Sequence, residues 1–93
     1  FPNIVDSPLQ SLVLASNNLA GKIPSTLGNF SSLCWLLLGD NNFQGNIPMS
    51  IDEIRNLEIL DITYNFLTGS VPASLYNMSA LTYLGMATNN LVA

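Results

Sequence analysis

Apolar residues return along this chain at intervals of 24 positions. One series consists of Leu9, Leu33, Leu57 and Leu81. Three further series are Leu12, Leu36, Leu60 and Leu84, then Leu14, Leu38, Ile62 and Met86, then Leu19, Phe43, Leu67 and Leu91. A period of this length is typical of a repeat architecture in which each repeat is one supersecondary unit. The sequence therefore predicts full units at 9–32, 33–56 and 57–80 and a partial unit at 81–93. Residues 1–8 are expected to be an irregular N-terminal segment or the remnant of a preceding repeat.

Each unit is predicted to open with a short strand. Residues 12–14 alternate between inward and outward positions, and the alternation recurs at 36–38, 60–62 and 84–86. A period of two residues is that of a β-strand. Strands that return in the same direction, with a crossover between them, form a parallel sheet. The remaining apolar positions of each unit predict a short return segment of 3₁₀ type that points into the core.

Asparagine, glycine and proline also occupy fixed slots. The asparagines are Asn17, Asn41, Asn65 and Asn89; the glycines are Gly21, Gly45 and Gly69; the prolines are Pro24, Pro48 and Pro72. An asparagine amide carries donors and an acceptor, so it can satisfy turn backbone groups and link stacked coils. We expect a structural ladder of the four asparagines, worth roughly 1 kcal/mol per net hydrogen bond. Glycine permits a positive φ, and proline fixes φ after an extended residue.

The combined pattern, L-x-x-L-x-L-x-x-N-x-L-x-G-x-I-P-x-x-L-x-x-L-x-x, resembles the plant-specific class of leucine-rich repeat, and the resemblance covers residues 9–93. It implies an α/β fold, a right-handed solenoid or horseshoe segment with a concave parallel sheet and short 3₁₀ and β return segments. It also implies a second, shorter strand around the G-x-I-P stretch. The repeats are most similar to those in the extracellular domains of plant leucine-rich-repeat receptor kinases. Secreted inhibitors of microbial polygalacturonases share the same repeat.

Two features depart from those ectodomains. They usually carry cysteine-paired caps, whereas Cys34 is the single cysteine here. They also contain more repeats, and the receptors add a transmembrane helix and a kinase. We therefore expect a fragment, or a truncated gene product, of a longer solenoid. It is expected to be either secreted or held at the extracellular face of the plasma membrane as part of a longer protein. Such a chain in isolation is expected to be marginally stable or to self-associate through its open edges.

Charge and composition narrow the range of partners. The formal net charge is −4, and Lys22 and Arg55 are the two cationic side chains, too few to neutralise a run of phosphates. We therefore expect no nucleic-acid partner. The longest apolar run, 33–38, is far shorter than the roughly 20 residues of a membrane-spanning helix, so no direct membrane insertion is expected.

Catalytic chemistry finds little support in the sequence. There is no histidine, which removes the usual Ser-His and Cys-His nucleophile pairs. Asp40, Glu58 and Asp61 could act as acid–base carboxylates on a sugar, but solvated surface carboxylates explain them more simply. Phosphate-binding and zinc-binding spacings are missing. The sequence predicts no enzyme, catalytic residue, metal or cofactor in this chain.

Binding residues are expected on the outward positions of the concave strands. One outward column holds Ser11, Trp35, Ile59 and Tyr83, and parallel strands lie about 4.8 Å apart, so these side chains form a continuous stripe. The candidate partner-binding residues are Trp35, Leu37, Asp40, Ile59, Asp61, Tyr64 and Tyr83. An exposed apolar stripe with a polar rim suits a protein or peptide contact. The alternative is that β-formers simply favour exposed strand positions.

Two N-x-S sequons mark candidate glycosylation sites. Asn29 and Asn77 lie 48 residues apart and so occupy the same slot of the repeat. Glycans on that side would leave the concave stripe open. Asparagine also suits this loop slot for structural reasons alone.

The sequence is consistent with three functions. The first is a recognition module of a receptor kinase ectodomain that binds a peptide, a protein ligand or a co-receptor in immunity or development. The second is a secreted inhibitor of the polygalacturonase-inhibitor type. The third is a structural spacer within a longer solenoid. Fold does not fix function, so other information must separate the first two. In the flanking coding sequence, a transmembrane segment and a kinase would indicate the first, and an end after a cysteine cap would indicate the second.

Overall fold

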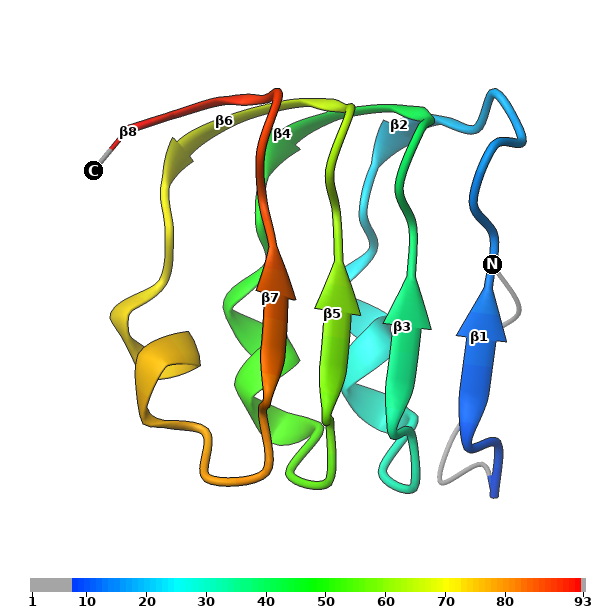
Figure 1. The fold of residues 1–93 in the computed structure, drawn as a ribbon, viewed down its shortest axis with the longest axis vertical. Coiled ribbons are helices and arrows are strands. Elements are labelled where there is room, and N and C mark those ends of the chain that lie inside the picture. Colours follow the sequence, from blue (N-terminus) through cyan, green and yellow to red (C-terminus); the bar gives the residue numbers. More distant parts are fainter. Residues whose placement is uncertain (1–7, 93) are drawn as a thin grey trace.

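The computed structural model describes residues 8–92, so nearly all of the expected N-terminal segment lies outside the described residues. Each unit contains a first strand, a turn and a second strand, and a 3₁₀ helix follows in three of the units (Figure 1). The first strands are β1 (Ser11–Val13), β3 (Trp35–Leu37), β5 (Ile59–Asp61) and β7 (Tyr83–Gly85). The second strands are β2 (Ala20–Lys22), β4 (Asn42–Asn46), β6 (Phe66–Ser70) and β8 (Asn90–Val92). The helices are η1 (Ser25–Asn29), η2 (Met49–Glu53) and η3 (Ala73–Asn77).

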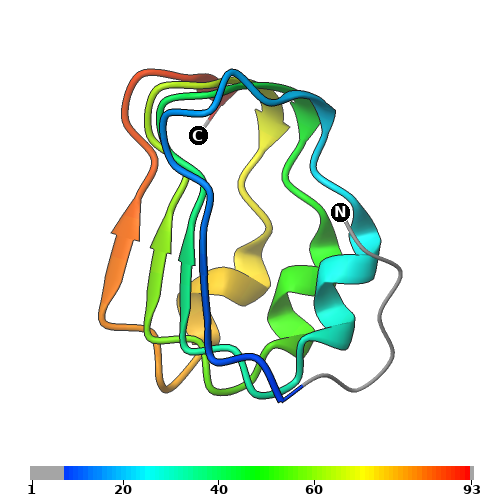
Figure 2. The same ribbon diagram turned by 90° about the vertical axis from the view of Figure 1, so that its right-hand side faces the viewer.

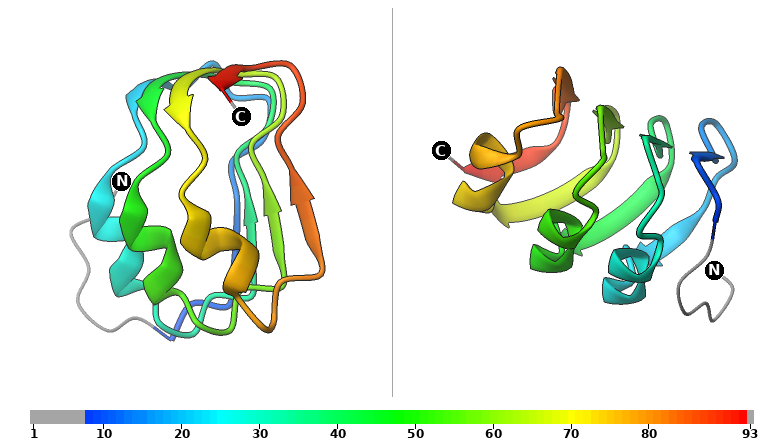
Figure 3. Two further views of the ribbon diagram at one scale, coloured as in Figure 1. Left: turned by 90° about the vertical axis from the view of Figure 1, so that its left-hand side faces the viewer. Right: turned by 90° about the horizontal axis from the view of Figure 1, so that it is seen from below.

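The first strands form one parallel sheet in the order β1-β3-β5-β7, which confirms the predicted architecture. Its register follows the 24-residue period: Leu12 pairs with Leu36, Leu36 with Leu60, and Leu60 with Leu84. The strands begin one residue before the predicted alternation, and the ladder continues beyond them through the hydrogen bond from Leu14 N–H to Leu37 O (2.8 Å). Seen from below, these strands lie closer together than the helices behind them, so the sheet lines the concave side (Figure 3).

The second strands form a separate parallel sheet, β2-β4-β6-β8, along one edge of the solenoid (Figure 2). The expectation that these strands are the shorter ones is wrong: β4 and β6 contain five residues each, against three in β3 and β5. Paired residues in this sheet are 22 positions apart, as Ala20 and Asn42 are. This register begins with the hydrogen bond from Asn42 N–H to Leu19 O (2.7 Å). This stagger carries the side chains of Lys22 and Asn46 over Gly45 and Gly69, which have φ of +81° and +79°.

Leucine, isoleucine and phenylalanine side chains fill the interior between the two sheets and the helices. Fully buried members include Leu27, Leu33, Leu36, Leu38, Ile51, Ile54, Leu57, Leu60, Ile62 and Leu67. The matching positions of the outermost coils, such as Leu12, Leu84 and Leu91, are only partly buried. This gradient arises because each coil of a solenoid packs only against its neighbours. The core is therefore continuous along the axis and most complete in the two central units.

Asn41 is a buried polar side chain that links two coils. Its Nδ2 group donates to the carbonyl oxygens of Leu38 and Gly39 in its own turn (3.0 and 3.1 Å). The same group donates to Leu14 O (2.9 Å) in the preceding coil. Its Oδ1 accepts the N–H groups of Asn17 (3.1 Å) and Leu19 (2.9 Å). Every polar atom of this amide is therefore paired with backbone, as burial requires.

Asn65 and Asn89 repeat this arrangement one and two units later. Both donate to two carbonyls of their own turn and to one carbonyl 27 residues earlier, Leu38 O and Ile62 O respectively. Asn65 Oδ1 accepts Phe43 N–H, and Asn89 Oδ1 accepts Leu67 N–H, each at 3.0 Å. Asn17 is exposed and donates within its own turn, to Leu14 O and Ala15 O. Within residues 8–92, three of the four asparagines thus join one coil to the coil before it.

The return segments pack most closely between η1 and η2. Gly28 in η1 lies so near η2 that an ideal Cβ on it would be 3.0 Å from Ser50 O and 3.2 Å from Ser50 Cβ. Ser50 Oγ donates across this junction to Ser25 O (2.7 Å). The same slot in the next two units holds Asp52 and Tyr76, whose side chains are exposed. The absence of a side chain at Gly28 therefore lets these two helices meet.

We expect Asn41→Ala to lower the free energy of unfolding by about 3 kcal/mol, because the N–H groups of Asn17 and Leu19 lose their acceptor inside the chain. Asn17→Ala is the matched control, and its expected cost is about 1 kcal/mol, because the affected carbonyls remain near solvent. Urea unfolding followed by circular dichroism measures both. Equal losses for the two variants would contradict the role assigned to the Asn41 amide.

Gly28→Ala is expected to destabilise the chain by about 1 kcal/mol. Forcing a methyl group into a filled space costs about 1–3 kcal/mol, and the smaller entropy of the unfolded alanine chain offsets part of this. Asp52→Ala, at the same slot of the next unit, should change the urea midpoint little because its side chain is exposed. A Gly28→Ala chain as stable as the parent would show that η1 and η2 can separate freely.

Candidate functional site

One face of the first sheet is bare. Figure 1 shows β1, β3, β5 and β7 in front of the helices, and no described element crosses in front of them. The strand register places Trp35 beside Ile59 and Ile59 beside Tyr83. We call these three residues the aromatic row. Trp35 and Tyr83 are 46% and 51% exposed, so the row presents large apolar surfaces to solvent beside one another.

Asp61 lies in the neighbouring column of the same face, between Leu37 on β3 and Gly85 on β7. Its Oδ1 accepts hydrogen bonds from Thr63 N–H (3.0 Å) and Thr63 Oγ1 (2.7 Å). These bonds fix the orientation of the carboxylate. Both hydrogen bonds that it receives within residues 8–92 go to Oδ1, so Oδ2 is available to a partner.

Two glycines flank the Asp61 carboxylate. An ideal Cβ on Gly85 would lie 3.1 Å from Asp61 Oδ1 and 2.9 Å from Tyr83 Oη. The phenol of Tyr83 therefore leans along the sheet toward the carboxylate, across the space that a larger residue would fill. An ideal Cβ on Gly39, on the other side, would lie 3.2 Å from Thr63 Oγ1. The Asp61 carboxylate therefore has glycines, which lack side chains, on both sides and the Tyr83 side chain beside it.

No cationic side chain shares this face. The two cations of the sequence are Lys22, on β2 in the second sheet, and Arg55, which follows η2. The stem of Lys22 lies over Gly45 in the second sheet. Within residues 8–92, the charged side chains near the first sheet are thus Asp61, Asp40 at the edge of the face, and the exposed Glu58 directly before β5, and all are acidic. Electrostatic complementarity favours a basic or neutral partner.

Asp40 and Tyr64 lie in the turns that follow β3 and β5. Both have φ of +55°, and Ser16 and Thr88 adopt the same left-handed conformation at 60° and 58°. For bulky residues such as Tyr64 this conformation is strained, and it persists because the following asparagine is held by its hydrogen bonds. Ser16 Oγ donates to Asp40 Oδ2 (2.9 Å), whereas the Tyr64 side chain is 62% exposed. These turns form the rim of the bare face.

Phe66 belongs to this rim and was not among the predicted site residues. Its side chain is 56% exposed, and it lines a hollow of about 250 Å³ together with Asp40, Tyr64 and Thr88. The other units have asparagine at this slot, at positions 18, 42 and 90. A single aromatic residue in a slot of asparagines was the pattern that could have identified it.

The sequon asparagines lie on the opposite side of the molecule. Asn29 is the last residue of η1 and Asn77 the last residue of η3, and both are exposed. The helices lie behind the first sheet in Figure 1, so both positions are separated from the aromatic row by the core. A modification at either residue would leave the bare face accessible.

The helices of residues 8–92 are single short 3₁₀ segments, and none is long and apolar enough to cross a membrane. In the same residues, no group of three or more His, Cys, Asp or Glu side chains is placed to hold a metal ion. Cys34 is a free, partly buried thiol whose Sγ lies 3.6 Å from Ser32 O.

Comparison with known proteins agrees with this geometry. The family model described as Leucine Rich Repeat matches residues 8–30 and 56–78. No curated protein sequence matches the chain significantly.

Solved plant structures match the fold closely. The ectodomain of the receptor kinase GASSHO1/SCHENGEN3 from Arabidopsis thaliana, in complex with CASPARIAN STRIP INTEGRITY FACTOR 2, is 43% identical with a TM-score of 0.87. The match covers 89% of this chain and 10% of that one. The plant peptide hormone receptor RGFR1 in complex with RGF2 is 36% identical with a TM-score of 0.88, and the match covers 89% and 13% of the two chains.

A shorter relative is the BIR3–SERK2 complex from Arabidopsis thaliana, with 38% identity, a TM-score of 0.87 and coverage of 90% of this chain and 45% of that chain. The chain thus spans less than half the length of each of these three structures. The chain belongs to the leucine-rich-repeat family, and its repeats are of the plant type found in receptor kinase ectodomains.

Proposed function

We propose that this chain is a non-catalytic recognition module that binds a peptide or protein ligand, or a co-receptor, on its concave face. The aromatic row beside Asp61, on a sheet face that no described element covers, is the observation that best supports this proposal. The module belongs to the extracellular region of a plant leucine-rich-repeat receptor kinase in immunity or development. Other parts of that protein hold it at the plasma membrane.

The comparisons support the same class of partner. One similar structure is the GASSHO1/SCHENGEN3 ectodomain in complex with CASPARIAN STRIP INTEGRITY FACTOR 2. Another is the plant peptide hormone receptor RGFR1 in complex with RGF2. A third is a complex of two proteins, BIR3 and SERK2. These ligands are those of the named proteins. For this chain they indicate that peptides and proteins are the classes to test first.

The physical chemistry of the face favours an extended, basic peptide. Trp35 and Tyr83 are large side chains with two χ angles each, so burying them costs little conformational entropy. The carboxylate of Asp61 is oriented by Thr63 and suits an arginine, lysine or amino-terminal group beside an aromatic ring. A basic side chain between Tyr83 and Asp61, with apolar residues on Trp35 and Ile59, would use the whole surface.

The double substitution Trp35→Ser and Tyr83→Ser is expected to abolish this recognition. A displayed peptide library selected on the parent chain supplies the ligands, and each substitution should cost about 2 kcal/mol, or roughly 30-fold in Kd. Met49→Ser is the matched control, because Met49 is a large apolar side chain that is 72% exposed but lies on η2. Trp35 is the single tryptophan, so its fluorescence reports occupancy of the parent row directly. Peptides that bind the double variant and the parent equally would instead favour the structural spacer.

The charge of the ligand is tested separately with Asp61→Asn. We expect the selected peptides to be basic and to bind this variant about fivefold more weakly, because a charge-assisted hydrogen bond becomes a neutral one. The difference should shrink in high salt. Asp52→Asn makes the same charge change on η2 and should leave binding unaltered. A set of acidic peptides, or equal losses for the two variants, would argue against the Asp61 subsite.

A further inference from the structure

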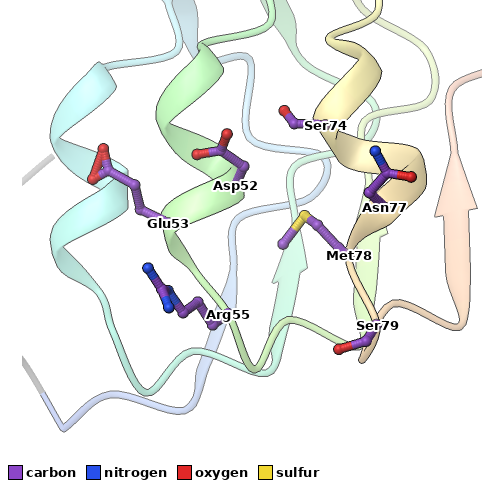
Figure 4. Close-up of a pocket in the computed structure, with 7 residues that line it drawn as sticks. All are labelled: Asp52, Glu53, Arg55, Ser74, Asn77, Met78 and Ser79. Atoms are coloured by element: carbon purple, nitrogen blue, oxygen red, sulfur yellow. The ribbon is translucent and has the colours of Figure 1, made fainter.

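The junction between η2 and η3 differs from the junction between η1 and η2. Gly28 allows close packing in the first junction, whereas Asp52 places a side chain at the same slot in the second. Figure 3 shows η3 set apart from the closely packed η1 and η2. A hollow of about 370 Å³ lies at the wider junction (Figure 4). Its lining is Asp52, Glu53, Arg55, Ser74, Asn77, Met78 and Ser79.

This hollow contains a hydroxyl group without a hydrogen-bond partner. Ser50 Oγ spans the first junction and donates to Ser25 O. Ser74 occupies the matching position one unit later, but its Oγ is buried and makes no hydrogen bond within residues 8–92. Buried polar groups in proteins are nearly always paired, so an unpaired one needs an explanation. A rotation of the Ser74 side chain toward the hollow would let a ligand group there supply the missing partner.

All three residues of the second sequon line the same hollow. Asn77 is exposed at its edge, Met78 points into the gap between the helices, and Ser79 follows (Figure 4). Asn29 occupies the same slot of its unit and is not part of this lining. A sugar attached to Asn77 would therefore begin at the mouth of a mostly polar recess. Its hydroxyl and N-acetyl groups can pair with Ser74, Asp52 and Arg55, and Met78 offers an adaptable apolar contact.

We propose that Asn77 carries an N-linked glycan whose first N-acetylhexosamine lies in the hollow between η2 and η3, with a hydrogen bond to Ser74. The donor is an oligosaccharide joined to a lipid pyrophosphate, and a transferase of the secretory pathway catalyses the step. The bond between Asn77 Nδ2 and sugar C1 forms, the C1–O bond to pyrophosphate breaks, the lipid pyrophosphate leaves, and the amide proton passes to a base of the transferase. The inference rests on the extracellular location proposed above and on no property of the concave face.

The first test is attachment. The full chain is secreted from plant cells as the parent, Asn29→Gln and Asn77→Gln, and mass spectrometry of the tryptic peptides measures sugar on each asparagine. We expect Asn77 to be occupied in both the parent and Asn29→Gln. A bare Asn77 in all preparations overturns the inference. The peptide-binding experiments use unglycosylated chain, so that result would leave the proposed function standing.

The second test is the position of the first sugar. Trimming with an endoglycosidase leaves a single N-acetylhexosamine on each occupied asparagine. We expect this sugar on Asn77 to raise the urea midpoint relative to Asn77→Gln, and Ser74→Ala to remove most of that increase. Enzymatic release of the trimmed sugar should also be several-fold slower from Asn77 in the folded chain than in the denatured chain. An increase that survives Ser74→Ala, or no increase together with equally fast release, places the glycan in solvent and overturns the inference.

Discussion

A buried asparagine amide that must pair with backbone from two coils is the constraint on which the rest of this solenoid depends. Asn41 connects Leu14 O in one coil with Leu38 O in the next, and its Oδ1 holds two N–H groups of the earlier coil. An amide that left these partners would strand several buried polar groups at once. The spacing of the coils and the path of each turn are therefore set by this one side chain. The leucines then fill whatever space the turns enclose.

The turn that admits the asparagine also determines what the surface presents. The preceding residue is forced to positive φ, at Asp40 and Tyr64 as at Ser16, and its side chain is left at the rim of the bare sheet. The energetic cost of a tyrosine in this conformation is met by the hydrogen bonds of Asn65 rather than by contacts of the tyrosine itself. Rim residues can consequently vary without loss of the fold. This freedom is what allows a recognition surface to be built on a strictly repeating frame.

The 24-residue period was sufficient to predict the first sheet, its register and the columns that contain Trp35, Ile59 and Tyr83, because each of those properties repeats with the sequence. It was insufficient for the second sheet, where the hydrogen bond from Asn42 N–H to Leu19 O shifts pairing to a 22-residue register. The proximity of Asp61 to Tyr83 and the opening beside Ser74 also escaped prediction. The first depends on the missing Cβ at Gly85, and the second on the Asp52 side chain at the slot where η1 has Gly28. The repeat pattern contains the identities of those residues, whereas the distances between their side chains come from the folded structure.

Departures from the repeat coincide with the places where this molecule can bind something. Asp52 replaces a glycine and opens the second helix junction, Phe66 replaces an asparagine at the rim, and Asp61 stands in a column otherwise occupied by Val13, Leu37 and Gly85. In a solenoid each coil is stabilised mainly by its nearest neighbours, so an outward substitution disturbs one junction at most. The frame therefore tolerates such residues at small cost in stability. That tolerance explains how an aromatic row with a carboxylate beside it and a polar hollow can lie on two different surfaces of this chain.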